Sequence, residues 1–299
     1  MATSIKNVTV LGAGVLGAQI AFQSAYAGFN VVSYDINDDA LKAAQDRFES
    51  IKKSYKTALP DEATDEKLSE ASGRITQTAD LEEAVKEADL VIEAVPEKID
   101  LKKKVWTDVG KAAPEHTIFT SNTSTLLPSS FADASGAPER FLSFHFANRL
   151  WVQRLAEIMP TEKTDEKYVE ELEAYANDMQ MDPVVLNKEE PGYIINSLLV
   201  PFLEAGQSLW ARGVADFKDI DRDWTIGMGV NNGPFQIMDV IGLRTVFAIS
   251  EDKIEEAGAG WRKEFVKRLK EEYVDENKLG VETGEGFYKY DEDGNPLNW

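Results

Sequence analysis

Short apolar runs alternate with apolar residues at helical spacing through the first part of the chain. Residues 7–11 form one such run, glycines crowd residues 12–17, and helical spacing covers residues 15–27. This pattern predicts a strand, a tight turn and a helix. A second run, residues 30–34, ends at Asp35 and completes a βαβ unit, because parallel strands need a crossover helix between them.

The same alternation continues along the chain. A helix is expected over about residues 38–55, because its apolar residues recur on one face. Further short strands are predicted at residues 75–76, 90–94, 118–121, 141–146 and 155–159. The polar segment 60–73 is expected to be an exposed excursion or a helical hairpin arm outside the core. Alternation of this kind predicts an α/β fold with a doubly wound, mostly parallel sheet of Rossmann type.

The pattern changes after a short apolar run at residues 184–186. Long apolar helical patterns follow, at residues 194–210, 225–229, 235–249 and 261–273. A chain of 299 residues favours two domains. We therefore expect a Rossmann domain at residues 1–187 and a smaller, all-helical domain at residues 188–299.

Composition and charge exclude several classes of function. The formal net charge of −21 opposes binding to nucleic acid and to anionic lipid. No apolar stretch of about 18 residues could span a bilayer, and the first strand begins too early to leave room for a signal peptide. Cysteine is absent and His116 and His145 are the two histidines, so neither disulfides, thiol catalysis nor a metal site is expected. These features predict a cytoplasmic protein.

The segment from Gly12 to Gly17, Gly-Ala-Gly-Val-Leu-Gly, fits the pattern G-x-G-x-x-G between a predicted strand and a predicted helix. Gly12 permits the turn, Gly14 lets the backbone approach a pyrophosphate, and Gly17 allows close packing of the helix on the strand. At Val15 and Leu16 the helix N-terminus supplies unpaired N–H groups and a partial positive charge. A diphosphate can therefore be bound without Lys or Arg.

Asp35 follows the glycine loop in the chain and stands at the end of the second strand. A carboxylate there can accept hydrogen bonds from ribose hydroxyls, whereas a 2′-phosphate would meet a like charge. NAD rather than NADP is therefore the predicted cofactor. The alternative is that the glycines only form a turn and that Asp35 caps the next helix.

His145 and Glu157 are the candidates for proton transfer. Alternation puts His145 on the strand face of Phe141 and Ser143, at the carboxyl end of that strand, where ligands of open α/β sheets bind. Glu157 interrupts an apolar run, where an unpaired carboxylate would be costly. Beside His145 it would orient an imidazole that exchanges a proton with a ketone or an alcohol. The alternatives are a structural histidine and a glutamate that reaches solvent.

Two further polar residues stand where a substrate could meet them. Asn196 shares a predicted helical face with Leu199 and Leu203, and a buried amide requires a partner. Ser124 follows a predicted strand and could offer its hydroxyl to a substrate carbonyl. Either residue could instead be structural, Asn196 at the start of its helix and Ser124 in a turn.

Several separated segments together resemble the L-3-hydroxyacyl-CoA dehydrogenase family over nearly the whole chain. Besides the glycine loop they are Glu93-Ala94-Val95-Pro96-Glu97, Ser121-Asn122-Thr123-Ser124, His145-Phe146-Ala147-Asn148, Pro191-Gly192-Tyr193-Ile194-Ile195-Asn196, Gly233-Pro234-Phe235 and Gly284-Glu285-Gly286-Phe287-Tyr288. The resemblance implies NAD-dependent hydride transfer that interconverts an (S)-3-hydroxyacyl-CoA and a 3-ketoacyl-CoA in fatty acid metabolism, with a short acyl chain as in 3-hydroxybutyryl-CoA and acetoacetyl-CoA. It also implies a homodimer formed through the helical domain.

The resemblance also implies roles for individual residues. His145 matches the family's acid/base, and Glu157, in the strand that follows, matches its carboxylate partner. Ser124 and Asn196 match the residues that position the substrate carbonyl and hydroxyl. Three more residues match positions near the nicotinamide ribose and ring: Glu97, Lys102 and Asn148.

The chain departs from the family next to His145. Many members read His-Phe-Phe-Asn-Pro, where this chain has Ala147 and Arg149, followed by Trp151. The variant resembles a branch that includes diketoreductases, which leaves the acyl substrate open.

Coenzyme A carries several negative charges, which would need cations. The residues proposed to bind it are Ser50, Lys53 and Lys56 on the second predicted helix, with Lys52 beside them. They could instead form a helix face that only meets water.

Three functions remain open at this point. The first is a 3-hydroxyacyl-CoA dehydrogenase. The second is a CoA-independent reductase of diketo or β-keto esters, or a gulonate-type 3-dehydrogenase of sugar acids. The third is a non-catalytic NAD-binding protein, as in crystallin relatives of the eye lens, and the presence of His145, Glu157, Ser124 and Asn196 argues against it.

Overall fold

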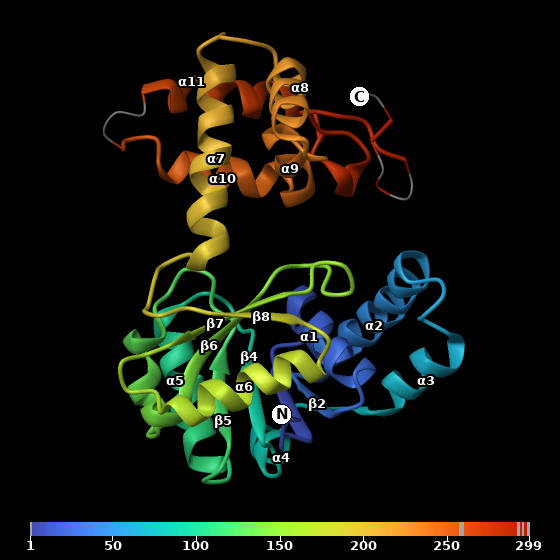
Figure 1. Cartoon of the computed structure of the whole chain (residues 1–299), viewed down its shortest axis with the longest axis vertical. Coiled ribbons are helices and arrows are strands. Elements are labelled where there is room, and N and C mark those ends of the chain that lie inside the picture. The colour runs from blue at the N-terminus through green and yellow to red at the C-terminus, as the bar shows by residue number, and fades with distance from the viewer. Residues whose placement is uncertain (1, 257–259, 292–293, 295, 298–299) are drawn as a thin grey trace. The chain divides into compact units, whose positions relative to one another are not determined.

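The structure, a computed structural model, describes residues 2–256, 260–291, 294 and 296–297 (Figure 1). The chain divides into two compact units, Met1–Ile194 and Ile195–Trp299. The domain boundary expected after residue 187 falls slightly before this division.

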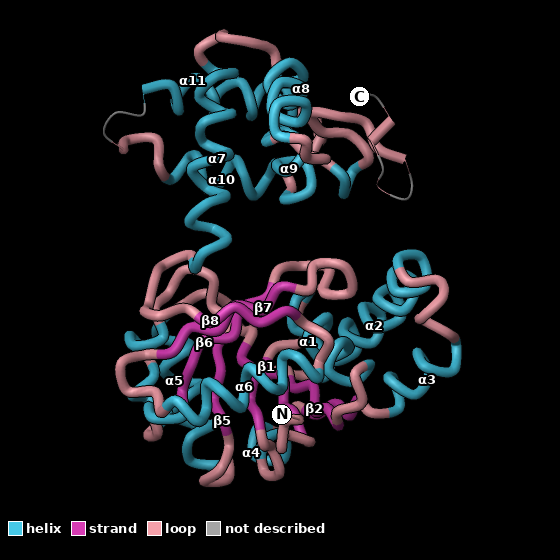
Figure 2. The backbone as a smooth tube through the Cα atoms, viewed as in Figure 1, coloured by secondary structure: helices cyan, strands magenta, loops and turns pink. Residues whose placement is uncertain are grey.

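The first unit is built on one eight-stranded sheet, drawn in magenta in Figure 2. In sheet order the strands are β3 (Ile75–Thr78), β2 (Asn30–Tyr34), β1 (Asn7–Leu11), β4 (Leu90–Glu93), β5 (Ile118–Ser121), β6 (Phe141–Phe146), β7 (Leu155–Pro160) and β8 (Asp182–Val185). All neighbours pair in parallel except β6 and β7, which are antiparallel. The predicted mostly parallel, Rossmann-type sheet is confirmed.

Helices cover both faces of this sheet. One face packs against α1 (Val15–Tyr26), α2 (Asp38–Ala58), α3 (Asp65–Gly73) and α6 (Glu166–Asp178), and the other against α4 (Leu81–Val85) and α5 (Ile99–Ala112). Alternation along the strands divides the side chains between two cores: Leu90 and Ile92 enter the first, and Val91 enters the second. Because both faces are covered, the central strands β4, β5 and β6 are buried at every residue.

The interpretation of residues 60–73 as an arm outside the core is wrong. Within this segment α3 contacts α1, and Ala63, Leu68 and Ala71 are buried in the first core. Only a few small or apolar residues carry this contact, and the polar residues around them hid it in the sequence pattern.

The described part of the second unit is helical, as predicted. Its helices are α7 (Tyr193–Ala211), whose first two residues belong to the first unit, α8 (Phe217–Met228), α9 (Pro234–Ile241), α10 (Leu243–Asp252) and α11 (Gly260–Leu269). The single helix expected at 235–249 is divided by Gly242, whose φ of +94° no continuing helix allows. The segment expected at 225–229 is the end of the longer α8.

Two buried carboxylates explain two of the segments that carried the family resemblance. Asp221 accepts hydrogen bonds from the N–H groups of Phe235 and Gln236, at 2.9 and 3.0 Å. Asp239 accepts bonds from the N–H groups of Phe287 and Tyr288, at 2.9 and 2.8 Å. A side chain on Gly233 or Gly286 would overlap these carboxylates. The Gly233 and Gly286 segments therefore hold the helical unit together.

Among the described residues, no helix has the length and apolar character needed to cross a membrane.

Candidate functional site

The glycine loop lies at the carboxyl end of β1, where the strand order changes direction between β1 and β4. Gly12 has a φ of +99°, and a Cβ on it would lie 2.7 Å from the carbonyl oxygen of Ala94, just beyond β4. A Cβ on Gly17 would overlap the carbonyl of Gly12. Both positions therefore require glycine, one for the turn and one for close packing of α1.

Gly14 differs from its neighbours because nothing lies within 4 Å of the place its Cβ would take. It is the N-cap of α1, which begins at Val15 without a side-chain cap. The N–H groups at Val15 and Leu16 are in the first turn of a helix, where no intrahelical acceptor exists for them. Open space in front of such donors fits the diphosphate of a dinucleotide.

Asp35 follows β2 and closes the loop from the other side. Its Oδ2 accepts a hydrogen bond from the N–H of Ala13 at 2.8 Å, and its Oδ1 accepts one from Ile36 at 2.8 Å. Each carboxylate oxygen keeps a second lone pair that can accept a ribose hydroxyl. Sequence reasoning missed Arg47, whose Nη1 donates to the carbonyl oxygen of Ala13 at 3.2 Å. The loop therefore has one arginine beside it, although none was expected.

His145 and Glu157 lie opposite each other in the antiparallel register of β6 and β7. The distance between His145 Nδ1 and Glu157 Oε2 is 3.0 Å, and the residues are 6% and 1% exposed. Because an ionised carboxylate can only accept, Nδ1 carries the proton of this hydrogen bond. Nε2 then faces the Oγ of Ser124 at 3.2 Å. The structure thus brings together three of the residues predicted for chemistry.

The loop that carries Ser124 is held by Glu97. One oxygen of Glu97 accepts hydrogen bonds from the N–H groups of Ser124, Thr125 and Leu126, at 3.1, 3.0 and 3.3 Å, and from the hydroxyl of Thr123. Burial acts to raise the pKa of Glu97, but these bonds and the charge of Lys102 outweigh it and lower the pKa to about 2. The carboxylate is therefore ionised, and accepts these bonds, at any pH near neutrality.

Lys102 is enclosed by the protein. It is 1% exposed, and its Nζ lies 2.6 Å from Glu93 Oε1 and 3.3 Å from Glu97 Oε2. Glu93 also accepts the hydroxyl of Ser121 at 2.7 Å. Sequence reasoning did not single out Glu93, although its place at the end of an apolar strand is the same signal that identified Glu157.

Asn148 lies beside α1. Gln19, which the sequence did not reveal, donates to Asn148 Oδ1 at 3.4 Å and accepts the N–H of Arg149 at 2.6 Å. The side chains of Asn148 and Arg149 are exposed, whereas Trp151 is buried with its ring 5.5 Å from that of Tyr55. The side chain of Trp151, where the chain departs from the family, is therefore accommodated in the core.

The remaining predicted residues lie away from this cluster or outside its unit. Asn196 is in α7 and belongs to the second unit. The side chains proposed for coenzyme A, Ser50, Lys53 and Lys56, are exposed on α2, and Lys56 forms an ion pair with Asp65.

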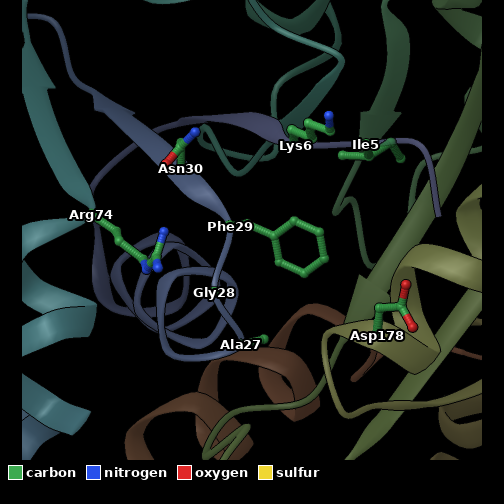
Figure 3. A pocket seen from close by; sticks show the side chains of 8 residues that line it. All are labelled: Ile5, Lys6, Ala27, Gly28, Phe29, Asn30, Arg74 and Asp178. Carbon is green, nitrogen blue, oxygen red and sulfur yellow. The ribbon is translucent and has the colours of Figure 1, made fainter. Parts of the chain in front are cut away.

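A hollow of about 480 Å³ lies at the opposite edge of the sheet (Figure 3). The ring of Phe29 lies near its centre, with Arg74 and Asp178 on either side. Its residues Ile5 and Lys6 precede β1, so it adjoins the amino ends of the strands. Dinucleotides bind at the carboxyl ends, and this hollow is therefore not the cofactor site.

A glycine loop at the switch point of a doubly wound sheet, with an imidazole and a carboxylate paired at the same edge, defines a dinucleotide-dependent oxidoreductase. Comparisons with known proteins give the family. Residues 7–190 match the model of the 3-hydroxyacyl-CoA dehydrogenase NAD-binding domain, and residues 192–290 match that of the C-terminal domain. The chain belongs to the 3-hydroxyacyl-CoA dehydrogenase family. It is an enzyme, an oxidoreductase whose cofactor is NAD.

Three similar proteins illustrate the range of the family. Human mitochondrial hydroxyacyl-coenzyme A dehydrogenase is 36% identical over 297 residues, covering 96% of this chain and 91% of that one. A probable 3-hydroxybutyryl-CoA dehydrogenase of Bacillus subtilis is 34% identical, covering 96% and 98%. The solved structure of a diketoreductase, described as acting on dicarbonyl compounds, is 49% identical with a TM-score of 0.90, covering 96% and 100%.

Two glycine variants separate the binding role of the loop from its folding role. Gly14→Ala places its methyl group in open space, so the melting temperature should stay within about 2 °C of wild type. NADH should nevertheless bind at least about tenfold more weakly, or about 1.4 kcal/mol, because the methyl occupies the approach of the diphosphate. Gly17→Ala should lower the melting temperature itself. Fluorescence titration and thermal melts measure both, and unchanged NADH binding by Gly14→Ala would contradict the assignment.

Proposed function

We propose that the protein interconverts a β-hydroxy and a β-keto group at C3 of its substrate, with His145 as the acid/base. The observation that carries this proposal is the Nδ1 contact with buried Glu157, which leaves Nε2 of the imidazole beside the Ser124 hydroxyl. An imidazole held in this way has one nitrogen committed to the protein and one available to a substrate hydroxyl.

The residues have separate tasks in this mechanism. When bound, NAD supplies or takes up the hydride at C4 of its nicotinamide. In the direction of ketone reduction, Nε2 of His145 gives its proton to the C3 oxygen, and in the reverse direction it removes that proton. Glu157 stabilises the imidazolium formed in the reverse direction. Ser124 and Asn196 are proposed to hold the C3 oxygen by hydrogen bonds.

Three residues are proposed to act at the nicotinamide ribose and ring. Glu97 holds the loop that follows β5 and is paired with Lys102. This fixed position supports the proposal that the two residues lie beside the ribose. Asn148 is exposed next to α1, whose first turn is the expected diphosphate site. Asp35 supports a preference for NAD over NADP.

The first candidate substrate is a short-chain 3-hydroxyacyl-CoA, as in the family's named members. A specific observation favours the second candidate, a CoA-free dicarbonyl compound: the diketoreductase shares 49% of its sequence with this chain. Lys53 is exposed and Lys56 is paired with Asp65. The two lysines therefore offer coenzyme A few fixed contacts on α2. Both candidates are β-dicarbonyl compounds in their oxidised form. The same acid/base, His145 with Glu157, could therefore act on either.

Replacing His145 tests the acid/base role. His145→Ala should lower kcat by roughly 10²- to 10⁴-fold, the usual contribution of a positioned acid/base. NADH should bind within about twofold of wild type, because the glycine loop does not depend on the imidazole. His116→Ala is the matched control, since His116 is the second of the two histidines and is exposed. Turnover close to wild type in His145→Ala would remove it from the role.

A comparison of two substrates decides whether the substrate carries coenzyme A. NADH oxidation is measured with acetoacetyl-CoA and with a diketo ester at matched concentrations, and each assay is repeated with NADPH. The CoA candidate requires at least about tenfold higher kcat/KM for the thioester, or about 1.4 kcal/mol. Equal or lower values support the dicarbonyl candidate. If Lys53 and Lys56 bind coenzyme A, Lys53→Ala/Lys56→Ala raises KM for the thioester alone.

We infer a homodimer formed through the helical unit. The support is a set of large apolar side chains exposed on its described helices: Leu198, Trp224, Ile226, Met228, Val240, Ile241 and Ile249. Light scattering should give twice the chain mass of 33.3 kDa at micromolar concentration. A mass of one chain, unchanged on concentration, would contradict the dimer.

The cytoplasmic location stays a prediction. One similar protein is named as mitochondrial and another comes from a bacterium. Fractionation of the host cell would decide it.

A further inference from the structure

Tyr193, the first residue of α7, lies flat on the ring of His145. The ring centroids are 4.3 Å apart and the planes differ by 13°. Tyr193 is 1% exposed, so its ring is shielded from solvent. The imidazole is therefore held at Nδ1 by Glu157, faced at Nε2 by Ser124, and covered on one side by an aromatic ring.

The same short segment reaches the other two groups of the site. The hydroxyl of Tyr193 donates to the carbonyl oxygen of Thr123 at 2.8 Å, one residue before Ser124. The N–H of Ile194 donates to Oε1 of Glu157 at 3.0 Å, the oxygen that His145 does not use. Residues 193–194 thus contact the imidazole, its carboxylate and the serine loop.

The backbone of Tyr193 is strained in this position. Its φ is +56°, in the left-handed region that residues with a Cβ rarely adopt. Gly192, with a φ of +84°, leads the chain into this turn. Such strain persists only where surrounding contacts fix the residue, and here the ring stack and two hydrogen bonds do so.

We propose that Tyr193 is a positioning residue that fixes the plane of the His145 ring and the place of the Ser124 loop for proton transfer. The contacts at Nδ1 and Nε2 are made at the edge of the imidazole and leave its plane free to tilt. A ring stacked on its face removes this freedom, because tilting would drive the two rings together. This inference rests on the proposed role of His145.

The phenol of Tyr193 is suited to act as a permanent hydrogen-bond donor. Burial raises its pKa, and this effect, together with the charges of Glu157, Glu97 and Glu93, outweighs a hydrogen bond with Ser143 that acts to lower it. The hydroxyl therefore keeps its proton over the whole pH range of an assay. Its bond to Thr123 is then independent of pH.

Two variants separate the ring from the hydroxyl. Tyr193→Leu removes the stack, and kcat should fall at least about tenfold with KM for NADH within about twofold. Tyr193→Phe keeps the stack and should retain kcat within about threefold, because the hydrogen bonds that Glu97 accepts still hold the Ser124 loop. Equal loss in both variants would assign the effect to the hydroxyl and overturn the stacking role.

The two histidines permit a direct view of the stack by NMR of the imidazole C–H signals. The His145 signal should move downfield in Tyr193→Leu, which removes the shielding ring, and stay in place in Tyr193→Phe. The His116 signal should not move in either variant, because its ring is exposed and contacts Asp89. If Tyr193→Leu does not fold, as judged by circular dichroism, Tyr193→Met carries the same expectations.

A double variant separates this inference from the proposed function. In His145→Ala, Tyr193→Leu should cause no further loss of kcat, because Tyr193 acts through the imidazole. A further tenfold loss, or about 1.4 kcal/mol, would show an independent role. A moved His145 signal with kcat unchanged in Tyr193→Leu would overturn the inference and leave the acid/base role intact. Full activity of His145→Ala would instead overturn the proposed function.

Discussion

The antiparallel register of β6 and β7 is the constraint on which the site depends. It sets His145 opposite Glu157 and Phe144 opposite Ile158. Phe144 and Ile158 enter the hydrophobic core, so the next pair must face the other way. A slip of one residue would exchange these faces and bury the imidazole in the core. The buried charge of Glu157 is tolerated because Nδ1 of His145 and the N–H of Ile194 both donate to it.

A second constraint is the acidity of the chain. A net charge of −21 repels a dinucleotide at long range, although physiological salt screens this repulsion beyond roughly 8 Å. Attraction must therefore come from groups close to the diphosphate. The first turn of α1 supplies backbone donors, and Arg47 adds a cation at the loop. Lys102 contributes no attraction of this kind, since Glu93 and Glu97 enclose its charge.

The sequence predicts those features whose signal lies within one element. The strand at 118–121 and the strand at 141–146 have the bounds that were expected, because each is a short apolar run between turn residues. Glu157 is visible because it breaks such a run. The role of Gly242 is hidden, since the apolar pattern continues past it and only its φ reveals the break. Tyr193 is hidden too, because its partner His145 lies far away in the sequence and periodicity reports only on neighbours in one element.

Four of the segments that resemble the family divide into two kinds, which explains why they indicate the chemistry better than the substrate. The Gly233 and Gly286 segments make room for buried carboxylates and hold the helical unit. The His145 and Ser124 segments place the groups that would act on C3. Neither kind therefore indicates what the substrate carries beyond C3. The variation at Arg149 fits this division, because Gln19 holds its backbone N–H and leaves its exposed side chain free to change without moving His145.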